Sequence, residues 1–390
     1  MKSLTKQCNV NMKKKIGMFL ENHFLPVYFL LQFIRKRRFI SHRFFHRREL
    51  FKFSVKVVKG VKPRDIELVS RLCKSYIERS VETPTSQWLE IFKDRHSDVH
   101  SLICNKDYET LAKYISNPVD NDLMYGFDDM TKTLNTKLRI ETKINPNNAF
   151  DALISLAEAL GATNVSNPED YCTIFPKKRE IYDILEKVID YLNMKNLTHP
   201  IFPNVFNGER GIATKYGVIS YRAPLALYQA QRALQFGKHI CEIGPGLGRT
   251  AYYAMLLGAE RYTLVDIPIS SFVQGGFLGD MFDKEDLGLS SEDWQSKKIQ
   301  IISPSQFFES HQKYDVIINV DSLTEIGQET ARDYIDHIKH CSKTFISINH
   351  ERNEFTVNGI MTDNSDFQLL QKSRCWIRRG YVEEIYRIIN

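Results

Sequence analysis

The chain has 390 residues, of which 43% are hydrophobic and 26% are charged. This balance is typical of a globular protein, and the length allows two domains of ordinary size. Seven cysteines are scattered along the sequence and include no C-x-x-C pair. The composition therefore argues against extensive disorder, many membrane spans, a disulfide framework and a cysteine-based zinc site.

The charge is unevenly distributed along the chain. Met1–Gly60 hold 15 Lys or Arg and 2 Glu, a net charge of +13, whereas the whole chain carries only +6. Within this segment, basic clusters at 13–15 and 35–38 flank the apolar run at 24–34. That run is too short to cross a bilayer, which takes about 20 apolar residues, and no small-residue cleavage site of a signal peptide follows it.

Aromatic and basic residues are interleaved throughout residues 1–60. This pattern predicts an amphipathic segment that lies in the interface of an anionic membrane. A basic arm that folds onto the acidic remainder of the chain is the alternative. No nucleic-acid-binding motif accompanies the segment, so we expect no nucleic-acid partner. The predicted location is the cytoplasm, with peripheral contact to the inner membrane face.

Residues 61–217 are predicted to form a mainly helical domain that ends in an irregular connection. Apolar residues recur every three or four positions in the ranges 65–80, 150–160 and 181–192. The first of these stripes consists of Ile66, Val69, Leu72, Cys73, Tyr76 and Ile77. We interpret the stripes as core, with Gly161 as the C-cap of the second helix. The Pro-, Gly- and Asn-rich stretch at 196–217 predicts a long loop and the domain boundary.

Residues 218–390 alternate between strand and helix patterns, which predicts a Rossmann-like α/β domain. Strands are expected at 239–244, 261–268, 298–303, 314–320 and 344–349, with helices at 223–237, 248–259, 271–282 and 328–340. At the end of the chain, the runs 373–379 and 381–389 flank Gly380. We expect them to form an antiparallel hairpin at the edge of a mostly parallel sheet.

The stretch CEIGPGLGRT follows directly on the first of these strands and is rich in glycine. Such a turn between strand and helix lets a ligand approach the backbone closely. Gly244, Gly246 and Gly248 have the spacing G-x-G-x-G, preceded by Glu242. Dinucleotide-binding folds need G-x-G-x-x-G, and their third glycine would stand where this chain has Arg249. A dinucleotide site is therefore not predicted.

The pattern acid-x-G-x-G-x-G resembles the first motif of class I S-adenosylmethionine-dependent methyltransferases. The resemblance implies that S-adenosylmethionine is the cofactor. Glu242 would orient its ammonium group, and Gly244, Gly246 and Gly248 would make room for its methionyl part and ribose. Asp266, which stands 18 residues beyond Gly248 at the end of the next strand, is placed to accept hydrogen bonds from both ribose hydroxyls.

A narrower resemblance concerns a group of bacterial sugar O-methyltransferases that carry an N-x-x-S-x-x-E-like sequence after the fourth strand. Asn319, Ser322 and Glu325 match that sequence, and the resemblance implies that Asn319 contributes to cofactor binding. The stretch at 219–234 is similar to the segment that those proteins place over the cofactor. Tyr221 and Arg222 are accordingly expected to contact the cofactor carboxylate or an anionic substrate. A solvated arginine at a helix start is the alternative for Arg222.

Three residues after the fourth and fifth strands are candidates for the catalytic base. In doubly wound sheets, ligands lie beyond the carboxyl ends of the strands, which selects Asp321, Glu325 and His350. His350 is the first choice because an imidazole titrates near neutral pH. A histidine bonded to the loop backbone is the alternative. Asp321 and Glu325 are alternative bases or holders of substrate hydroxyls, and Glu325 is also a candidate helix cap.

The sequence predicts an O-methyltransferase that acts on a saccharide or glycolipid, in the biosynthesis of cell-surface glycans. Two other functions stay open: methylation of another small molecule or a lipid headgroup, and cofactor binding without catalysis in an assembly complex. Asp336, His337 and His340 share one helical face with a spacing that metals use, but a polar helix face explains them equally well. No metal site is predicted, and the oligomeric state is left open.

Overall fold

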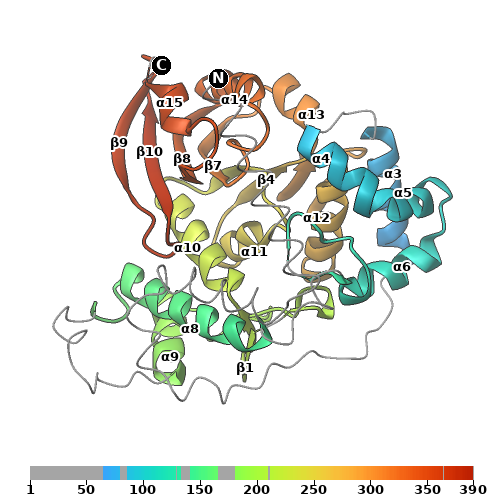
Figure 1. The fold of residues 1–390 in the computed structure, drawn as a ribbon, viewed down its shortest axis with the longest axis horizontal. Coiled ribbons are helices and arrows are strands. Elements are labelled where there is room, and N and C mark those ends of the chain that lie inside the picture. Colours follow the sequence, from blue (N-terminus) through green and yellow to red (C-terminus); the bar gives the residue numbers. More distant parts are fainter. Residues whose placement is uncertain are drawn as a thin grey trace, which may run out of the picture. The chain divides into compact units, whose positions relative to one another are not determined.

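The computed structural model describes residues 65–79, 86–128, 130–132, 141–165, 181–209, 211–362 and 364–389 (Figure 1). The basic segment at 1–60, for which the sequence predicts a membrane contact, lies outside the described residues. The candidate site residues all lie inside them.

An eight-stranded sheet forms the centre of the described structure. Its strand order is β5-β6-β4-β3-β7-β8-β10-β9. The bounds are β3 His239–Ile243, β4 Arg261–Val265, β5 Leu287–Leu289, β6 Ile299–Ile302, β7 Tyr314–Val320, β8 Ser342–His350, β9 Phe367–Arg374 and β10 Tyr381–Ile388. Only β10 runs antiparallel to its neighbours, β8 and β9. The predicted Rossmann-like sheet with a C-terminal antiparallel hairpin is confirmed.

Helices cover both faces of this sheet (Figure 1). The helices that follow strands are α10 Arg222–Leu234, α11 Arg249–Leu256, α12 Pro268–Met281, α13 Pro304–Glu309, α14 Gln328–Cys341 and α15 Val357–Met361. Consecutive strand residues point to opposite faces, so Ile240 packs in the core with α10 to α12 and Cys241 in the core with α13 to α15. Burial on both faces explains why the central strands consist mainly of apolar residues.

The residues before the sheet are mainly helical, as predicted. The elements are α3 Ile66–Arg79, α4 Ser86–Ile91, the π-helix η3 Phe92–His96, α5 Ser97–Cys104, α6 Tyr108–Ser116, the short 3-10 turn η4 Pro118–Asp120, α8 Glu141–Leu160 and α9 Ile181–Tyr191. Gly161 follows α8 with a φ of +77°, which confirms it as the C-cap. The predicted stripe of α3 needs a correction: Ile66 and Ile77 are exposed, and Leu68 joins the buried face instead.

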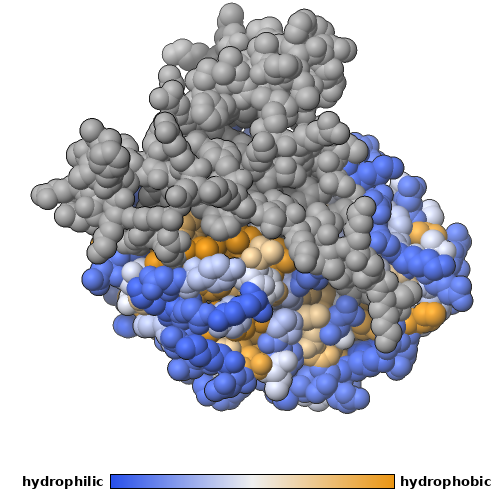
Figure 2. Space-filling view, turned by 90° about the horizontal axis from the view of Figure 1, so that it is seen from below, coloured by the Kyte–Doolittle hydropathy of each residue, from blue (hydrophilic) through white to orange (hydrophobic). Residues whose placement is uncertain are grey.

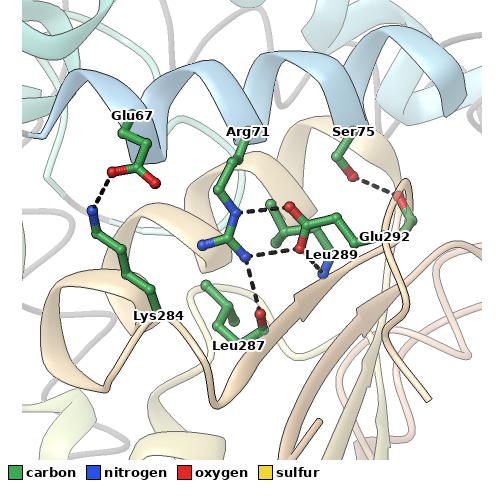
Figure 3. A network of polar contacts seen from close by, with 8 residues as sticks. Glu67, Arg71, Ser75, Lys284, Leu287, Leu289 and Glu292 are labelled. Atoms are coloured by element: carbon green, nitrogen blue, oxygen red, sulfur yellow. Dashed lines mark hydrogen bonds and ion pairs between the residues drawn. The ribbon is translucent and has the colours of Figure 1, made fainter. Parts of the chain in front are cut away.

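Helix α3 packs against α12, and a row of polar contacts joins it to β5 and the residues on either side of that strand (Figure 3). Arg71 donates through Nε and Nη2 to the two carboxylate oxygens of Glu292, at 2.7 and 2.8 Å, and through Nη2 to the carbonyl of Leu287 at 3.0 Å. Lys284 pairs with Glu67 at 2.9 Å. Helices from before and after residue 217 therefore share one packed core, while the division into domains at that point stays a prediction.

Two sequence interpretations near the ends of the sheet region are corrected. The stretch at 196–217 is not wholly irregular, because β1 Gly211–Thr214 pairs antiparallel with β2 Gly217–Ser220. The first strand of the C-terminal hairpin is Phe367–Arg374, earlier than predicted, and residues 375–380 form the turn. The sequence patterns misled here because β9 is an exposed edge strand that carries mostly polar residues. Strand β5 and helices α13 and α15 were not predicted, since they are too short for periodicity to reveal.

In the described part of the chain, every helix is too short or too polar to cross a lipid bilayer. Figure 2 shows one face of the molecule, on which hydrophilic residues make up much of the described surface and apolar residues lie among them. Scattered apolar side chains of this kind are normal for a protein surface.

Candidate functional site

The glycine turn follows β3, the strand from which the order of the later strands runs outward in both directions of the sheet. Strand β3 is followed by β4 on one side, and β7 flanks it on the other. Ligands bind at such a switch point, beyond the carboxyl ends of the strands. A cavity of about 360 Å³ lies there, a volume within the range of small-molecule sites.

The first two glycines of the turn are required for different reasons. Gly244 has a φ of +68°, and a Cβ on it would lie 2.2 Å from the Ser322 hydroxyl oxygen, so the loop after β7 can approach only a bare backbone. Gly246 has a φ of +58°, and a Cβ on it would meet nothing within 4 Å. Gly246 lines the cavity. The turn therefore leaves open space at Gly246 for a ligand to approach the backbone.

Most of the predicted site residues meet around this cavity. Its walls include Tyr221, Arg222, Glu242, Gly244, Gly246, Asp266, Asp321 and Glu325. Gly248, Asn319 and His350 are not among the lining residues. Residues that are up to about 100 positions apart in the sequence are thus brought together by the sheet topology, as the argument from strand ends predicted.

Glu242 is a buried carboxyl group at the end of β3. The Tyr262 hydroxyl donates a hydrogen bond of 2.7 Å to its Oε2 atom. Among the described residues, no Lys or Arg forms an ion pair with it. Burial raises the pKa of Glu242 from 4.5 to about 7, and the nearby charge of Asp266 adds to this effect.

Asp266 stands at the end of β4, on the other side of the glycine turn. Its Oδ1 accepts from the Ile267 backbone N–H at 2.8 Å, and its Oδ2 accepts from Gln274 Nε2 at 2.8 Å. The same Gln274 nitrogen donates to the Gly246 carbonyl at 2.9 Å. Burial raises the pKa of Asp266 to about 7 despite these donors. Gln274 therefore links Asp266 to the glycine turn through hydrogen bonds to both. The sequence analysis missed Gln274, because a single glutamine in a mainly apolar helix belongs to no motif.

Asn319 is buried behind the cavity wall. Its Nδ2 donates to the Ile243 carbonyl at 2.9 Å and contacts the Ser322 hydroxyl at 2.5 Å. Its Oδ1 accepts from Asn349 Nδ2 at 3.0 Å. These bonds hold the end of β3 against the loop after β7. A direct contact of Asn319 with a cofactor stays a prediction.

His350 is the last residue of β8, and its ring lies against Tyr381 of β10 with the centroids 5.5 Å apart. Its Nδ1 is 3.4 Å from the Arg352 backbone nitrogen. This is the backbone-bonded arrangement considered as the alternative to catalysis. Asp321 and Glu325, by contrast, line the cavity. The geometry favours these two carboxyl groups over His350 as the groups that meet a substrate.

Arg222 lines the cavity and pairs through Nε with Asp128 Oδ2 at 3.3 Å. Asp128 also binds buried Arg249 at 2.5 Å, and Arg249 in turn binds Glu209 at 2.7 Å. Burial opposes the ionisation of Asp128, but Arg249 and Arg222 outweigh it and hold the pKa of this carboxyl below its usual range. Arg249, which occupies the position that a dinucleotide fold would fill with glycine, thus anchors the start of α11 to the helical region.

Arg378 is a cavity residue that the sequence analysis missed. It stands in the turn between β9 and β10 and pairs through Nη1 with Asp321 Oδ2 at 2.5 Å. Its guanidinium carbon lies 3.7 Å from the centroid of the Tyr381 ring. The only sequence signal was the run of basic residues beside Gly380, which was interpreted as part of a strand.

Within the residues that the structure describes, no group of three or more His, Cys, Asp or Glu side chains is arranged to hold a metal ion. On the α14 face that has metal-like spacing, Asp336 pairs with Lys339 at 3.2 Å. The ring of His337 packs against Phe307 and Phe308.

No family model and no curated protein matches the chain. Among solved structures, it is similar to a ribosomal protein L11 methylase from Lactobacillus delbrueckii subsp. bulgaricus, with 18% identity, 43% of this chain and 78% of that chain covered, and a TM-score of 0.31. It is also similar to the magnesium protoporphyrin IX methyltransferase from Synechocystis PCC 6803 with bound SAM, with 15% identity, 60% and 95% covered, and a TM-score of 0.29. A glycopeptide N-methyltransferase complexed with sinefungin shows 10% identity, 43% and 93% covered, and a TM-score of 0.33. At such scores, cofactor and activity have to be argued from the site itself.

Proposed function

We propose that the chain binds S-adenosylmethionine in this cavity and transfers its methyl group to a hydroxyl of a saccharide. The observation that carries the proposal is the pairing of a bare turn with two carboxyl groups, one buried (Glu242) and one partly buried (Asp266). Gly246 leaves space against the backbone, and Glu242 and Asp266 flank it from the ends of neighbouring strands.

The two carboxyl groups beside the glycine turn fit a cationic group of a ligand. The pKa values of Glu242 and Asp266 are both raised to about 7 because burial is not offset by a cation among the described residues. S-adenosylmethionine carries an ammonium and a sulfonium group, which would supply the missing positive charge. Its ribose hydroxyls are donors for carboxylate oxygens such as those of Asp266. Arg222, Arg249 and Arg378 also line the cavity, so this charge argument applies to the part of the cavity around Glu242 and Asp266.

The bound cofactor would supply an electrophilic methyl group. The residues of this chain would then hold the acceptor hydroxyl in line and take its proton, because a sugar hydroxyl is a very weak acid. We assign this work to Asp321 and Glu325, which follow β7 and line the cavity. Holding reactants in the right geometry contributes about 7 to 11 kcal/mol to such reactions, and a general base adds about 10²- to 10⁴-fold in rate.

The assignment of a saccharide as the acceptor is more specific than the assignment of the cofactor and has its own support. Two features support it: the match of Asn319, Ser322 and Glu325 to the sugar O-methyltransferase sequence, and the cavity side chains that suit hydroxyl groups. The latter include the carboxyl groups of Asp321 and Glu325 and the ring of Tyr221. We further propose that residues 1–60 hold the enzyme at an anionic membrane, which rests on their charge and aromatic content alone.

The test has two stages. Calorimetry with S-adenosylhomocysteine measures whether the purified full-length protein binds the cofactor product, and the absence of binding would refute the cofactor assignment. Incubation with methyl-labelled S-adenosylmethionine and separate envelope, lipid and small-molecule fractions then identifies the labelled product. Label in a glycan or glycolipid is the expected result. Label only in a lipid headgroup or a small metabolite would overturn the saccharide assignment and leave the cofactor assignment intact.

A further inference from the structure

We infer that Arg378 is a positioning residue of the acceptor site: it holds Asp321 as an anchor for the acceptor and thereby leaves Glu325 to take the proton. This inference rests on the proposed function. It assigns separate work to two carboxyl groups that the sequence could not tell apart, and it gives a role to a residue from the C-terminal hairpin.

Asp321 has an unusual conformation and an unusual distribution of hydrogen bonds. Its φ of +69° lies in the left-handed region, which costs a residue other than glycine conformational energy, although aspartate adopts it more readily than most residues. Its Oδ2 is held twice, by Arg378 at 2.5 Å and by the Tyr381 hydroxyl at 3.1 Å. Its Oδ1 is buried and has no hydrogen-bond partner in the described part of the chain. An acceptor oxygen held in this way at a cavity wall is suited to a donor from a ligand.

Arg378 holds this carboxylate from the turn between β9 and β10. The guanidinium group stacks over the Tyr381 ring, and the Tyr381 hydroxyl binds the same Asp321 oxygen. Burial disfavours the charge on Arg378, but Asp321, Tyr381 and Tyr221 together outweigh this effect and raise the pKa of the guanidinium group, so the cation persists. Asp321, Arg378 and Tyr381 therefore contact one another in all three pairs, and these contacts fix the orientation of Asp321 Oδ1.

Glu325 lies four residues beyond Asp321 and also lines the cavity. Its carboxylate makes no ion pair with the described residues. The charged groups that act on it are Asp321, on its own loop, and Arg378, on the hairpin turn. Burial and the charge of Asp321 raise the pKa of Glu325 to about 7. Asp321 is paired with Arg378 and Tyr381, whereas Glu325 has no charged partner of this kind in the described part of the chain, and this difference suits the two carboxyl groups to different roles.

With Asp321 as the anchor and Glu325 as the base, the acceptor must be a molecule with two hydrogen-bond donors. One donor, such as a second hydroxyl of a sugar, binds Asp321 Oδ1. The reacting hydroxyl faces Glu325. As its oxygen forms a bond to the methyl carbon, the carbon–sulfur bond breaks, its electron pair stays on sulfur, and the hydroxyl proton passes to Glu325. A simple alcohol with one hydroxyl would lack the anchor.

The test measures pH–rate profiles with labelled cofactor and the acceptor fraction, together with the affinity for S-adenosylhomocysteine. Because Glu325 must be ionised, the rate of the wild type should rise through a pH of about 7 and then level off. Arg378→Gln removes a positive charge and should move this midpoint upward by about one pH unit or more, whereas Asp321→Asn removes a negative charge and should move it downward. Arg378→Lys should restore the midpoint in part. Exposed Arg379 supplies the matched control, and Arg379→Gln should change nothing.

All of these variants should keep their affinity for S-adenosylhomocysteine within about twofold, because none of the substituted groups belongs to the glycine turn. Arg378→Gln should also raise the Michaelis constant for the acceptor. Shifts in the same direction for Arg378→Gln and Asp321→Asn, or no shift, would overturn the inference and leave the proposed function standing. A wild-type protein that binds S-adenosylhomocysteine but labels no acceptor would likewise overturn it. Absence of S-adenosylhomocysteine binding would refute the proposed function itself, and this inference with it.

Discussion

Substitution of Gly246 by alanine is the most direct test of the proposal that the cofactor binds against the glycine turn. In the structure, a Cβ at this position would meet no atom within 4 Å, so the folded protein has no collision to relieve. The remaining cost is conformational: at a φ of +58°, an L-residue loses about 1–2 kcal/mol. The stiffer unfolded chain of the alanine variant offsets about 0.4–1 kcal/mol of this. The free energy of unfolding should therefore fall by only about 1 kcal/mol.

The effect on ligand binding should be much larger than this loss of stability. The new methyl group would occupy the space at which we propose that the cofactor meets the backbone, and we expect the affinity for S-adenosylhomocysteine to fall more than about tenfold, which corresponds to 1.4 kcal/mol. Gly161→Ala is the matched control, since Gly161 has a φ of +77°, equally open surroundings and no part in the cavity. Gly244→Ala is unsuitable, because its Cβ would collide with Ser322.

Urea unfolding and titration calorimetry on the two variants separate the two effects. Both variants should lose similar stability, and only Gly246→Ala should lose affinity. If Gly246→Ala binds S-adenosylhomocysteine as tightly as Gly161→Ala does, the ligand does not lie against this turn, and the reasoning from bare backbone to cofactor fails.

Three other predictions follow from described contacts and from the sequence. The pKa of Glu242 is raised from 4.5 to about 7 in the folded protein, so ionisation of Glu242 destabilises the ligand-free fold as the pH rises from about 4.5 to about 7. Glu242→Gln should therefore raise the melting temperature relative to wild type more at pH 8 than at pH 5. An equal effect at both pH values would contradict the burial argument. Arg71→Met should lower the free energy of unfolding, measured by urea unfolding, by about 1–3 kcal/mol, because it leaves the partly buried Glu292 without its charged donor. A change below about 0.5 kcal/mol would show that α3 is held by its apolar face alone. Deletion of residues 1–60 should abolish flotation with anionic vesicles while S-adenosylhomocysteine binding persists, whereas flotation that survives the deletion would place the membrane contact elsewhere in the chain.

Local patterns in the sequence were sufficient for most of the elements and for the position of the glycine turn. Helical stripes such as the one at 65–80 and apolar strands such as 314–320 were identified correctly, because periodicity and burial are local properties of the chain. The same holds for Gly244, Gly246 and Asp266, whose positions follow from the rule that ligands lie at the ends of parallel strands. Even there, Ile66 and Ile77 were wrongly assigned to the core, since a stripe does not reveal which edge of a helix a neighbour covers.

The tertiary structure alone brought the distant partners of the site together. Arg378 lies on a hairpin whose first strand is polar and exposed, and its contact with Asp321 spans 57 positions of the chain. Gln274, which joins Asp266 to the Gly246 carbonyl, looks like one polar residue on an apolar helix until α12 is packed against the sheet. Contacts of this kind depend on strand order and helix packing, which arise from the summed burial of many residues. The sequence by itself therefore locates the glycine turn after β3, whereas only the tertiary structure shows which distant side chains lie around it.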